Sequence, residues 1–594
     1  MTSSPLPPVP LPPEPLAAAE AWLAEDPDPQ TAAELRELLG RAAEDSQAGA
    51  AARAELADRF AGTLAFGTAG LRAALGAGPA RMNRVVVRRT AAGLGRFLLD
   101  TAAGAYTPRV VVGFDARHNS EAFAAESAAV FTALGLETFL MPAALPTPVL
   151  AYAVKALDCD GGVMVTASHN PPQDNGYKVY LGGRAVPAEG RGAQIVPPYD
   201  AEIAARIDYA PALRTIELAE AGWSTLPASG QDGSIEDAYV DAVAGTVRPD
   251  LFPHRRLKIV LTPLHGVGGR TALDVLHKAG FADVHLVEAQ AAPDPDFPTV
   301  AFPNPEEAGA LDLALAAAEE LDADIVLAND PDADRLAVAL KVPETGRWSM
   351  LRGDEVGALL GAHMVARLQA GPAGGTPEGS VPAVFANSIV SSRLLGRIAA
   401  AAGFGHVQTL TGFKWIARVP GLAYGYEEAL GYCVAPGLVA DKDGISAALL
   451  AAELAADAAA AGRSLLADLD ELQLAHGIHA TDQLSVRVGS LDLLDAMMKR
   501  LRDTPPESFG GSPVASVVDL AAGAGGLPPT EGLEYLTRDD SRVIIRPSGT
   551  EPKLKCYIEV IRPVPAADLL APARAEIAGV IDMIREDISD ALGL

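Results

Sequence analysis

The chain has 594 residues, of which 49% are hydrophobic, and its formal net charge is −29. This length is too great for one hydrophobic core and favours three to four domains. The charge argues against a general nucleic-acid or anionic-membrane binder, so an anionic substrate would need a locally basic pocket. The three cysteines, Cys159, Cys433 and Cys556, show no metal-ligand spacing and are expected to be buried thiols in a reducing compartment.

The start of the chain predicts no targeting segment. It is Pro-rich over residues 1 to about 15, which indicates a disordered or extended lead, and it lacks the basic and apolar regions of a signal peptide. No apolar stretch reaches membrane-spanning length. We therefore expect a soluble, cytoplasmic protein that works as a monomer or homodimer without a nucleic-acid or membrane partner.

Ala-rich helical patterns continue to about Ala61 and are followed by Phe66-Gly-Thr-Ala-Gly-Leu-Arg72. Glycines let backbone N–H groups approach an anion, and Arg72 is suited to clamp it. The alternative is a plain connection between a helix and a strand. Further on, Arg109 to Gly113 predicts a buried strand of the parallel type.

The turn Asp115-Ala-Arg-His-Asn-Ser120 follows that strand. Ser120 is predicted to be the N-cap of a helix that runs through Leu134. Asp115 and Arg117 then lie at the carboxyl end of the strand, where open α/β sheets bind their ligands. The alternative for this turn is a cap with a surface ion pair.

The next strand, Gly161 to Val165, leads into Thr166-Ala-Ser-His-Asn-Pro-Pro-Gln-Asp-Asn-Gly-Tyr-Lys178. Its loop should place Ser168 and His169 beyond the strand's carboxyl end, with Asn175-Gly176 as a turn into a strand from Tyr177 to Leu181. A hydroxyl, an imidazole and the ammonium of Lys178 would then share one rigid loop. A surface turn is the alternative for this segment taken alone.

A second strand–helix–strand unit begins at Leu257, and its strand Ala323 to Ala328 leads into Asp330-Pro-Asp-Ala-Asp334. Three carboxylates at alternate positions can converge on a hard cation such as Mg²⁺, which prefers oxygen ligands. An EF-hand is excluded because Arg335 stands where that loop needs Gly and Lys341 where it needs Glu.

Residues 371 to 380 predict a linker or long loop. A third unit follows to about residue 480 and contains Thr411-Gly-Phe-Lys414, the paired acids Glu427 and Glu428, and Asp441-Lys-Asp-Gly444. Glu427 and Glu428 stand between glycines and are suited to accept hydrogen bonds from sugar hydroxyls.

The last part of the chain mixes strands and helices and predicts a smaller α+β domain. Its landmark is Arg546-Pro-Ser-Gly-Thr-Glu-Pro-Lys553. A guanidinium, two hydroxyls and an accessible Gly N–H are the groups needed to bind a phosphate, although an ordinary Pro-Ser-Gly turn is the alternative.

Together the motifs supply a nucleophile, a metal-binding loop, a hydroxyl-recognising loop and a phosphate-binding loop. These are the parts needed for phosphoryl transfer on a phosphorylated polyol. No GxSxG elbow surrounds Ser168, so a hydrolase triad is not supported.

On these four motifs, in this order, the chain resembles the α-D-phosphohexomutases, the phosphoglucomutase/phosphomannomutase superfamily, over about residues 60 to 562. The resemblance implies that Ser168 is a phosphoserine and that Asp330, Asp332 and Asp334 bind Mg²⁺ together with its phosphate. It implies that Glu427, with Glu428 beside it, recognises the sugar. It also implies a phosphate-binding loop and further cleft residues. The phosphate-binding residues are Arg546, Ser548, Gly549, Thr550 and Lys553. The further cleft residues are Arg72, Asp115, Arg117, His169, Lys178, Arg335 and Lys414.

The resemblance implies three βαβ-type, mixed-sheet α/β domains and a smaller C-terminal α+β domain around a central cleft. The expected segments are a lead at 1–15 and domains at 16–250, 251–370, 371–480 and 481–594. The implied activity is a phosphoglucomutase that interconverts glucose 1-phosphate and glucose 6-phosphate through glucose 1,6-bisphosphate, with His169 or Lys178 moving the hydroxyl proton.

Several alternatives stay open. Phosphopentomutase or phosphomannomutase activity is one alternative, since Ala429 stands where many members of the family have Ser. The stretches Thr262 to Gly268 and Pro293 to Thr299 resemble those of the family branch that acts on glucose and pentose phosphates. A phosphatase with an aspartyl nucleophile is disfavoured, because Asp334 and Leu336 stand where that motif has Thr or Val. A non-catalytic sensor is disfavoured by the intact Ser168 and acidic loop.

Overall fold

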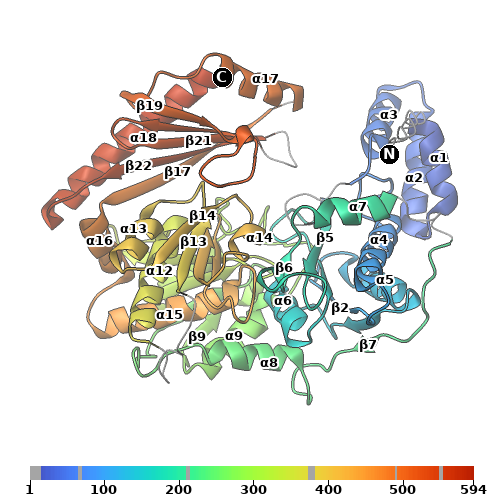
Figure 1. Ribbon diagram of the computed structural model, residues 1–594, viewed down its shortest axis with the longest axis horizontal. Coiled ribbons are helices and arrows are strands. Elements are labelled where there is room, and N and C mark those ends of the chain that lie inside the picture. Colours follow the sequence, from blue (N-terminus) through green and yellow to red (C-terminus); the bar gives the residue numbers. More distant parts are fainter. Residues whose placement is uncertain (1–14, 65–69, 209–214, 372–381, 489–490, 548–552) are drawn as a thin grey trace.

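The computed structural model describes residues 15–64, 70–208, 215–371, 382–488, 491–547 and 553–594. The predicted Pro-rich lead, the predicted linker at 371–380 and the predicted phosphate ligands Ser548, Gly549 and Thr550 therefore lie wholly or almost wholly outside the described residues. Figure 1 shows four sheets with helices packed on them, and a small helical bundle at the N-terminal end of the described chain.

The N-terminal bundle consists of α1 (Pro15–Glu25), α2 (Pro29–Ala42) and α3 (Gln47–Phe60). The Asp28 side chain accepts a hydrogen bond from the Gln30 N–H at the start of α2, and Ser46 does the same for Gly49 at the start of α3. The three helices share a small core that includes Leu35 and also Ala77, which lies outside the bundle. The bundle therefore packs against the chain that follows it.

Domain I contains one seven-stranded sheet in the order β1-β5-β4-β2-β3-β7, with β6 beside β5. The strands β2, β3, β4 and β7 are parallel, whereas β5 runs antiparallel to both β4 and β1. Its elements are β1 (Gly70–Ala74), α4 (Arg84–Ala102), β2 (Arg109–Phe114), α5 (Ser120–Ala133), β3 (Glu137–Leu140), α6 (Thr147–Ala156), β4 (Gly161–Val165), β5 (Asp174–Leu181), β6 (Ala193–Gln194), α7 (Tyr199–Asp208) and β7 (Ser224–Thr225).

Two local predictions in domain I are wrong. Ser120 is the first residue of α5 rather than its N-cap; Asn119 occupies the cap with φ 66°, and the Ser120 hydroxyl donates to Asp115 instead. Asn175-Gly176 is not a turn, because β5 already begins at Asp174 and Gly176 pairs with Arg72 of β1. In both places a distant segment also takes part: the Ser120 hydroxyl accepts from Asn175 of β5, and β5 pairs with β1.

Domain II has a five-stranded sheet in the order β12-β11-β10-β8-β9. The strands β9, β8 and β10 are parallel, and β11 returns antiparallel to β10, so the loop between β10 and β11 lies at the carboxyl end of a buried strand. Its elements are α8 (Ile235–Ala244), β8 (Ile259–Thr262), α9 (Gly268–Lys278), β9 (Val284–Leu286), α10 (Glu288–Ala291), α11 (Asp312–Leu321), β10 (Ile325–Asn329), β11 (Leu336–Val342) and β12 (Arg347–Met350).

Domain III has a four-stranded sheet in the order β14-β13-β15-β16. Its elements are α12 (Gly353–Gln369), β13 (Val384–Ser388), α13 (Leu394–Ala401), β14 (Gly405–Thr409), α14 (Phe413–Ile416), β15 (Leu422–Glu427), β16 (Gly431–Cys433), α15 (Gly444–Ala460) and α16 (Leu465–His476). The Ala-rich α15 is buried along most of its length. Within the described ranges no single helix is long and apolar enough to cross a membrane, and α15 with α16 passes that test only as a pair bent by 91°.

Domain IV is a six-stranded antiparallel sheet in the order β17-β22-β21-β20-β19-β18. Figure 1 shows α18 running along this sheet, which lies next to domain III. Its elements are β17 (Ile478–Arg487), α17 (Leu491–Asp503), β18 (Ser508–Phe509), β19 (Ser512–Asp519), β20 (Leu533–Thr537), β21 (Arg542–Pro547), β22 (Lys553–Arg562) and α18 (Leu570–Leu592). The predicted fold class, three mixed α/β domains and a C-terminal α+β domain, is confirmed.

Candidate active site

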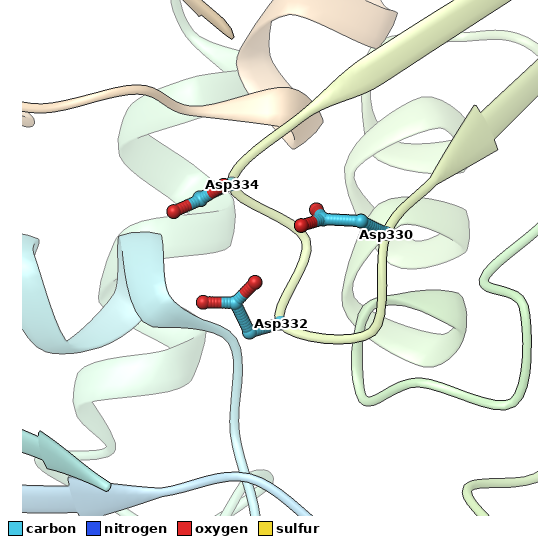
Figure 2. Close-up of side chains that lie close together, drawn as sticks. All are labelled: Asp330, Asp332 and Asp334. Carbon is cyan, nitrogen blue, oxygen red and sulfur yellow. The ribbon is translucent and has the colours of Figure 1, made fainter. Parts of the chain in front are cut away.

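The loop between β10 and β11 brings Asp330, Asp332 and Asp334 together. One carboxylate oxygen of each lies within 4.8 Å of the others, and Figure 2 shows the three groups around a shared space. All three side chains are buried. Oδ1 of Asp332 and Oδ1 of Asp334 are buried without a hydrogen-bond partner among the described residues. Unpaired buried carboxylate oxygens are costly, and a hard cation is the group that such oxygens fit.

Cations surround the acidic loop. Lys178 Nζ donates to Asp332 and to Asp334, 2.7 Å in each case, and Lys442 Nζ lies 3.2 Å from Asp334. Burial raises the pKa of Asp330 well above its usual range, and the neighbouring Asp332 and Asp334 raise it further. Burial would also raise the pKa of Asp334, but Lys178 and Lys442 hold it below the usual range.

Ser168 lies directly over this loop. Its hydroxyl donates to Asp330 Oδ2 at 2.8 Å and lies 3.4 Å from His169 Nδ1. Burial and the nearby guanidinium groups of Arg335 and Arg72 lower the pKa of His169 well below its usual value, so this imidazole is neutral at neutral pH. Lys178 differs: its two carboxylate partners raise its pKa despite burial, so it is protonated. Of the two predicted proton carriers, His169 has the lowered pKa and Lys178 the raised one.

A cavity of about 240 Å³ opens above Ser168 and is bounded by all four domains. Domain I contributes Arg72, Ser168, Lys178 and Gln194; domain II contributes Asp334 and Arg335; domain III contributes Thr411, Gly412, Phe413, Glu427, Glu428, Ala429 and Lys442; and domain IV contributes Arg546, Pro547, Lys555 and Tyr557. The cavity thus joins an acidic loop that suits a metal to a wall of cations that suits a phosphorylated ligand.

Hydrogen bonds from other residues of domain III hold the side chains of Glu427 and Glu428 in place. Glu427 Oε1 accepts from the Gly412 N–H at 2.6 Å, and burial, with Glu428 nearby, raises its pKa. Glu428 Oε2 accepts from the hydroxyls of Ser388 and Ser391. The next residue, Ala429, offers its carbonyl to Arg335 and has no side-chain hydroxyl.

Eight of the predicted site residues in the described ranges line this cavity, and seven do not: Asp115, Arg117, His169, Asp330, Asp332, Lys414 and Lys553. Arg117 turns under the Ser168 loop and bonds its backbone carbonyls. The Lys414 ammonium lies 5.8 Å from the centre of the Trp415 ring, and burial lowers its pKa. On β22, Lys555 lines the cavity, whereas the predicted Lys553, two residues earlier, does not.

The residues near the site that carried no predicted role include Lys442, Lys555 and Thr147. Lys442 belongs to the Asp441-Lys-Asp-Gly444 motif and can be recognised in the sequence, but its pairing with Asp334 cannot. Lys555 was identifiable in principle, because residues at a spacing of two on a strand share a face. Thr147, at the start of α6, donates its hydroxyl to Asp332 Oδ2 at 2.5 Å, and no local motif marks it.

Comparisons with known proteins identify the family of the chain. Family models described as phosphoglucomutase/phosphomannomutase α/β/α domains I, II and III match residues 63–210, 237–343 and 352–472, and the model of the C-terminal domain matches 492–577.

Two curated relatives and one solved structure illustrate the likeness. The "Probable phosphomannomutase" of Haemophilus influenzae is 42% identical over 480 residues, covering 80% of this chain and 93% of that protein. The phosphopentomutase of Mus musculus is 34% identical over 575 residues, covering 91% of this chain and 89% of that protein. A phosphoglucomutase/phosphomannomutase family protein from Burkholderia thailandensis has the same fold, with a TM-score of 0.63, 21% identity, and coverage of 89% of this chain and 97% of that one. The chain therefore belongs to the α-D-phosphohexomutase superfamily of phosphosugar mutases, isomerases that move a phosphoryl group within a sugar phosphate.

Proposed function

We propose that this enzyme interconverts α-D-glucose 1-phosphate and glucose 6-phosphate, with a phosphoserine at Ser168 as the phosphoryl carrier. The observation that carries this proposal is the Ser168 hydroxyl, 2.8 Å from Asp330 at the floor of a cation-lined cavity. A nucleophile buried against a site for a hard cation, and open to a cavity, is the arrangement that phosphoryl transfer requires.

The steps follow from these positions. The phosphate on Ser168 passes to the free hydroxyl of the sugar phosphate: the bond between phosphorus and Ser168 Oγ breaks, and a bond to the sugar oxygen forms. The bisphosphate then turns in the cavity, and its other phosphoryl group returns to Ser168. The sugar hydroxyl loses a proton in the first transfer, and we propose His169 as its acceptor, because the pKa of His169 is lowered whereas that of Lys178 is raised.

We assign the metal site to Asp330, Asp332 and Asp334, and the ion to Mg²⁺. When bound, Mg²⁺ supplies positive charge that neutralises the transferring phosphoryl group. Arg546 and Lys555 on domain IV, together with Ser548, Gly549 and Thr550, are proposed to hold the phosphate that is not reacting. Arg72 and Arg335 line the cavity on the other side, and Glu427 and Glu428 are proposed to recognise the sugar hydroxyls.

Pentose phosphates are the second candidate substrate. Ala429 cannot donate the hydrogen bond that a Ser would, and the mouse phosphopentomutase is similar to this chain over 91% of its length. A site built to bond a hydroxyl rejects analogues lacking it by about 10⁴-fold. Without that bond, the preference for glucose over ribose 1-phosphate should stay well below this factor.

A coupled assay over glucose, mannose, ribose and glucosamine 1-phosphates, each with and without its bisphosphate, tests the proposal. The highest kcat/KM is expected for glucose 1-phosphate, with ribose 1-phosphate within about 10⁴-fold. Ala429→Ser should widen that ratio. If kcat/KM is higher for mannose or ribose 1-phosphate, that sugar phosphate replaces glucose 1-phosphate as the assigned substrate. If none of the four is turned over, the proposed mutase function is rejected.

A further inference from the structure

Arg117 lies beneath the loop that carries Ser168. It follows β2 on the turn from Asp115, and its side chain is only 1% exposed. Its guanidinium donates to the carbonyl of Ser168 at 2.6 Å and to that of Asn170 at 2.5 Å. It also donates to the carbonyls of Pro171 at 2.8 Å and of Asp174 at 3.2 Å. One buried cation therefore ties together four carbonyls spread over seven residues of the loop.

The backbone at Ser168 needs this support. Its φ is 51°, in the left-handed region that non-glycine residues rarely adopt, and such a conformation persists only where surrounding contacts impose it. The Thr166 hydroxyl accepts from the Ser168 N–H at 2.9 Å on one side of the residue, and Arg117 binds the Ser168 carbonyl on the other. Ser168 Oγ reaches Asp330 from this backbone conformation. The bonds from Thr166 and Arg117 therefore also fix the direction of the Ser168 hydroxyl.

Arg117 is itself held on two sides. Asp115 Oδ1 accepts from the Arg117 N–H at 3.0 Å, and Asp115 Oδ2 lies 3.4 Å from the guanidinium. On the other side the ring centre of Phe297, a buried residue of domain II, lies 4.9 Å from Arg117 Cζ. The ring belongs to the stretch Pro293 to Thr299, whose Asp296 also lies 2.7 Å from His118 Nε2. An aromatic face attracts a guanidinium and keeps water from it, which strengthens the bonds beneath.

We propose that Arg117 and Phe297 are positioning residues that hold the Ser168 loop in its reactive shape across the junction of domains I and II. Arg117 is absent from the residues that line the cavity, so in this arrangement it acts on the loop and not on the substrate. The ring of Phe297 completes the support only when domain II is docked, which is also when Asp330 meets Ser168. The inference rests on the proposed role of Ser168 as the phosphoryl carrier.

The test compares Arg117→Lys and Phe297→Leu with a control, Phe302→Leu. Phe302 is an exposed phenylalanine five residues after Phe297. Each purified variant is checked for its melting temperature and then assayed for kcat, for KM of glucose 1-phosphate, and for the rate at which glucose 1,6-bisphosphate phosphorylates Ser168, followed by intact mass. Lysine keeps the charge but cannot span four carbonyls, so kcat and the phosphorylation rate of Arg117→Lys should fall together by about 10- to 100-fold, with KM within about threefold of wild type.

Phe297→Leu should lower the same two rates by a smaller factor, about three- to tenfold, because it removes only the ring contact. Phe302→Leu should match wild type. The proposal is overturned if Arg117→Lys raises KM at unchanged kcat, which would make Arg117 a substrate ligand, or if Phe297→Leu behaves like Phe302→Leu. If Arg117→Lys does not fold, the comparison of the two phenylalanines decides alone. Failure of wild type to take up phosphate at Ser168 would reject the proposed function instead.

Discussion

Lys178 balances the charge of the acidic loop, and replacing it by Met should expose how much the loop depends on a cation. Its ammonium group bonds Asp332 and Asp334 at 2.7 Å each, and all three side chains are at most 5% exposed. Met has a similar length and no charge. In Lys178→Met the two carboxylates would stay buried, and Lys442 and Arg335 would remain close to Asp334.

Removing one partner of a buried ion pair typically costs about 3–5 kcal/mol, because the other charge is left uncompensated. Here one cation serves two carboxylates, so the upper end of this range is expected for the metal-free protein. A change of that size lowers the melting temperature of a domain of this class by at least about 5 °C. Mg²⁺ should reverse much of the loss, since a ligand that binds only the folded state stabilises it by mass action.

Thermal unfolding in chelator, followed by a Mg²⁺ titration, measures both effects. Lys341→Met is the matched control: this lysine lies on β11, is 39% exposed and pairs at 3.0 Å with an exposed glutamate, so its loss should cost less than about 1 kcal/mol. The reasoning fails if Lys178→Met melts at the wild-type temperature in chelator. It also fails if Mg²⁺ raises the melting temperature of the variant by no more than that of wild type.

Two further predictions concern the cleft, and a third concerns a buried acid of domain IV. Ser168→Ala should take up no phosphate by intact mass and show only background turnover; full activity would end the assignment of Ser168 as the carrier. Arg546→Ala should raise KM for the sugar phosphate by about 10- to 150-fold through loss of charge-assisted bonds, and should make activity depend more on added bisphosphate; a collapse of kcat at unchanged KM would instead place Arg546 in the chemical step. In domain IV, burial opposes ionisation of Glu559, but Arg542, His479 and Arg393 hold its pKa below the usual range. A lowered folded pKa stabilises the protein at neutral pH, and this contribution is lost as the pH falls through that pKa. Glu559→Gln should therefore melt below wild type at pH 7, with a gap that narrows on acidification; a gap that does not change with pH would contradict this.

The parts of the site that could be predicted from the sequence are those whose chemistry is written in a few consecutive residues. The three aspartates follow a continuous apolar strand, so their place at the carboxyl end of β10 and their convergence follow from strand geometry alone. The loop of Ser168 between β4 and β5 follows from the same rule. For the three aspartates the local pattern and the final contact involve the same segment, whereas the contact of Ser168 with Asp330 joins two domains.

What could not be predicted depends on pairs that are distant in the chain. Arg117 was expected among the cleft residues, yet it binds carbonyls more than 50 positions away, and nothing in the Asp-Ala-Arg turn specifies that target. Ser120 fits the residue preference of an N-cap, but its hydroxyl donates to Asp115 and accepts from Asn175, 55 positions away, and Asn119 takes the cap position. Local propensity is a weak prior where tertiary contacts compete for the same polar group.

The charge distribution explains how a strongly acidic chain can hold an anionic substrate. The described residues that line the cavity include six Lys or Arg side chains and three Asp or Glu side chains, against a net charge of −29 for the whole chain. Charges on the outer surface are screened beyond about 8 Å at physiological ionic strength, whereas those in a partly enclosed cavity are screened much less. The cavity cations therefore act on a bound phosphate more strongly than the distant surface acids do. In the proposed reaction the bisphosphate carries twice the phosphate charge of the substrate, and cations of domain I and domain IV line the same cavity, so we expect these cations to favour its retention while it turns.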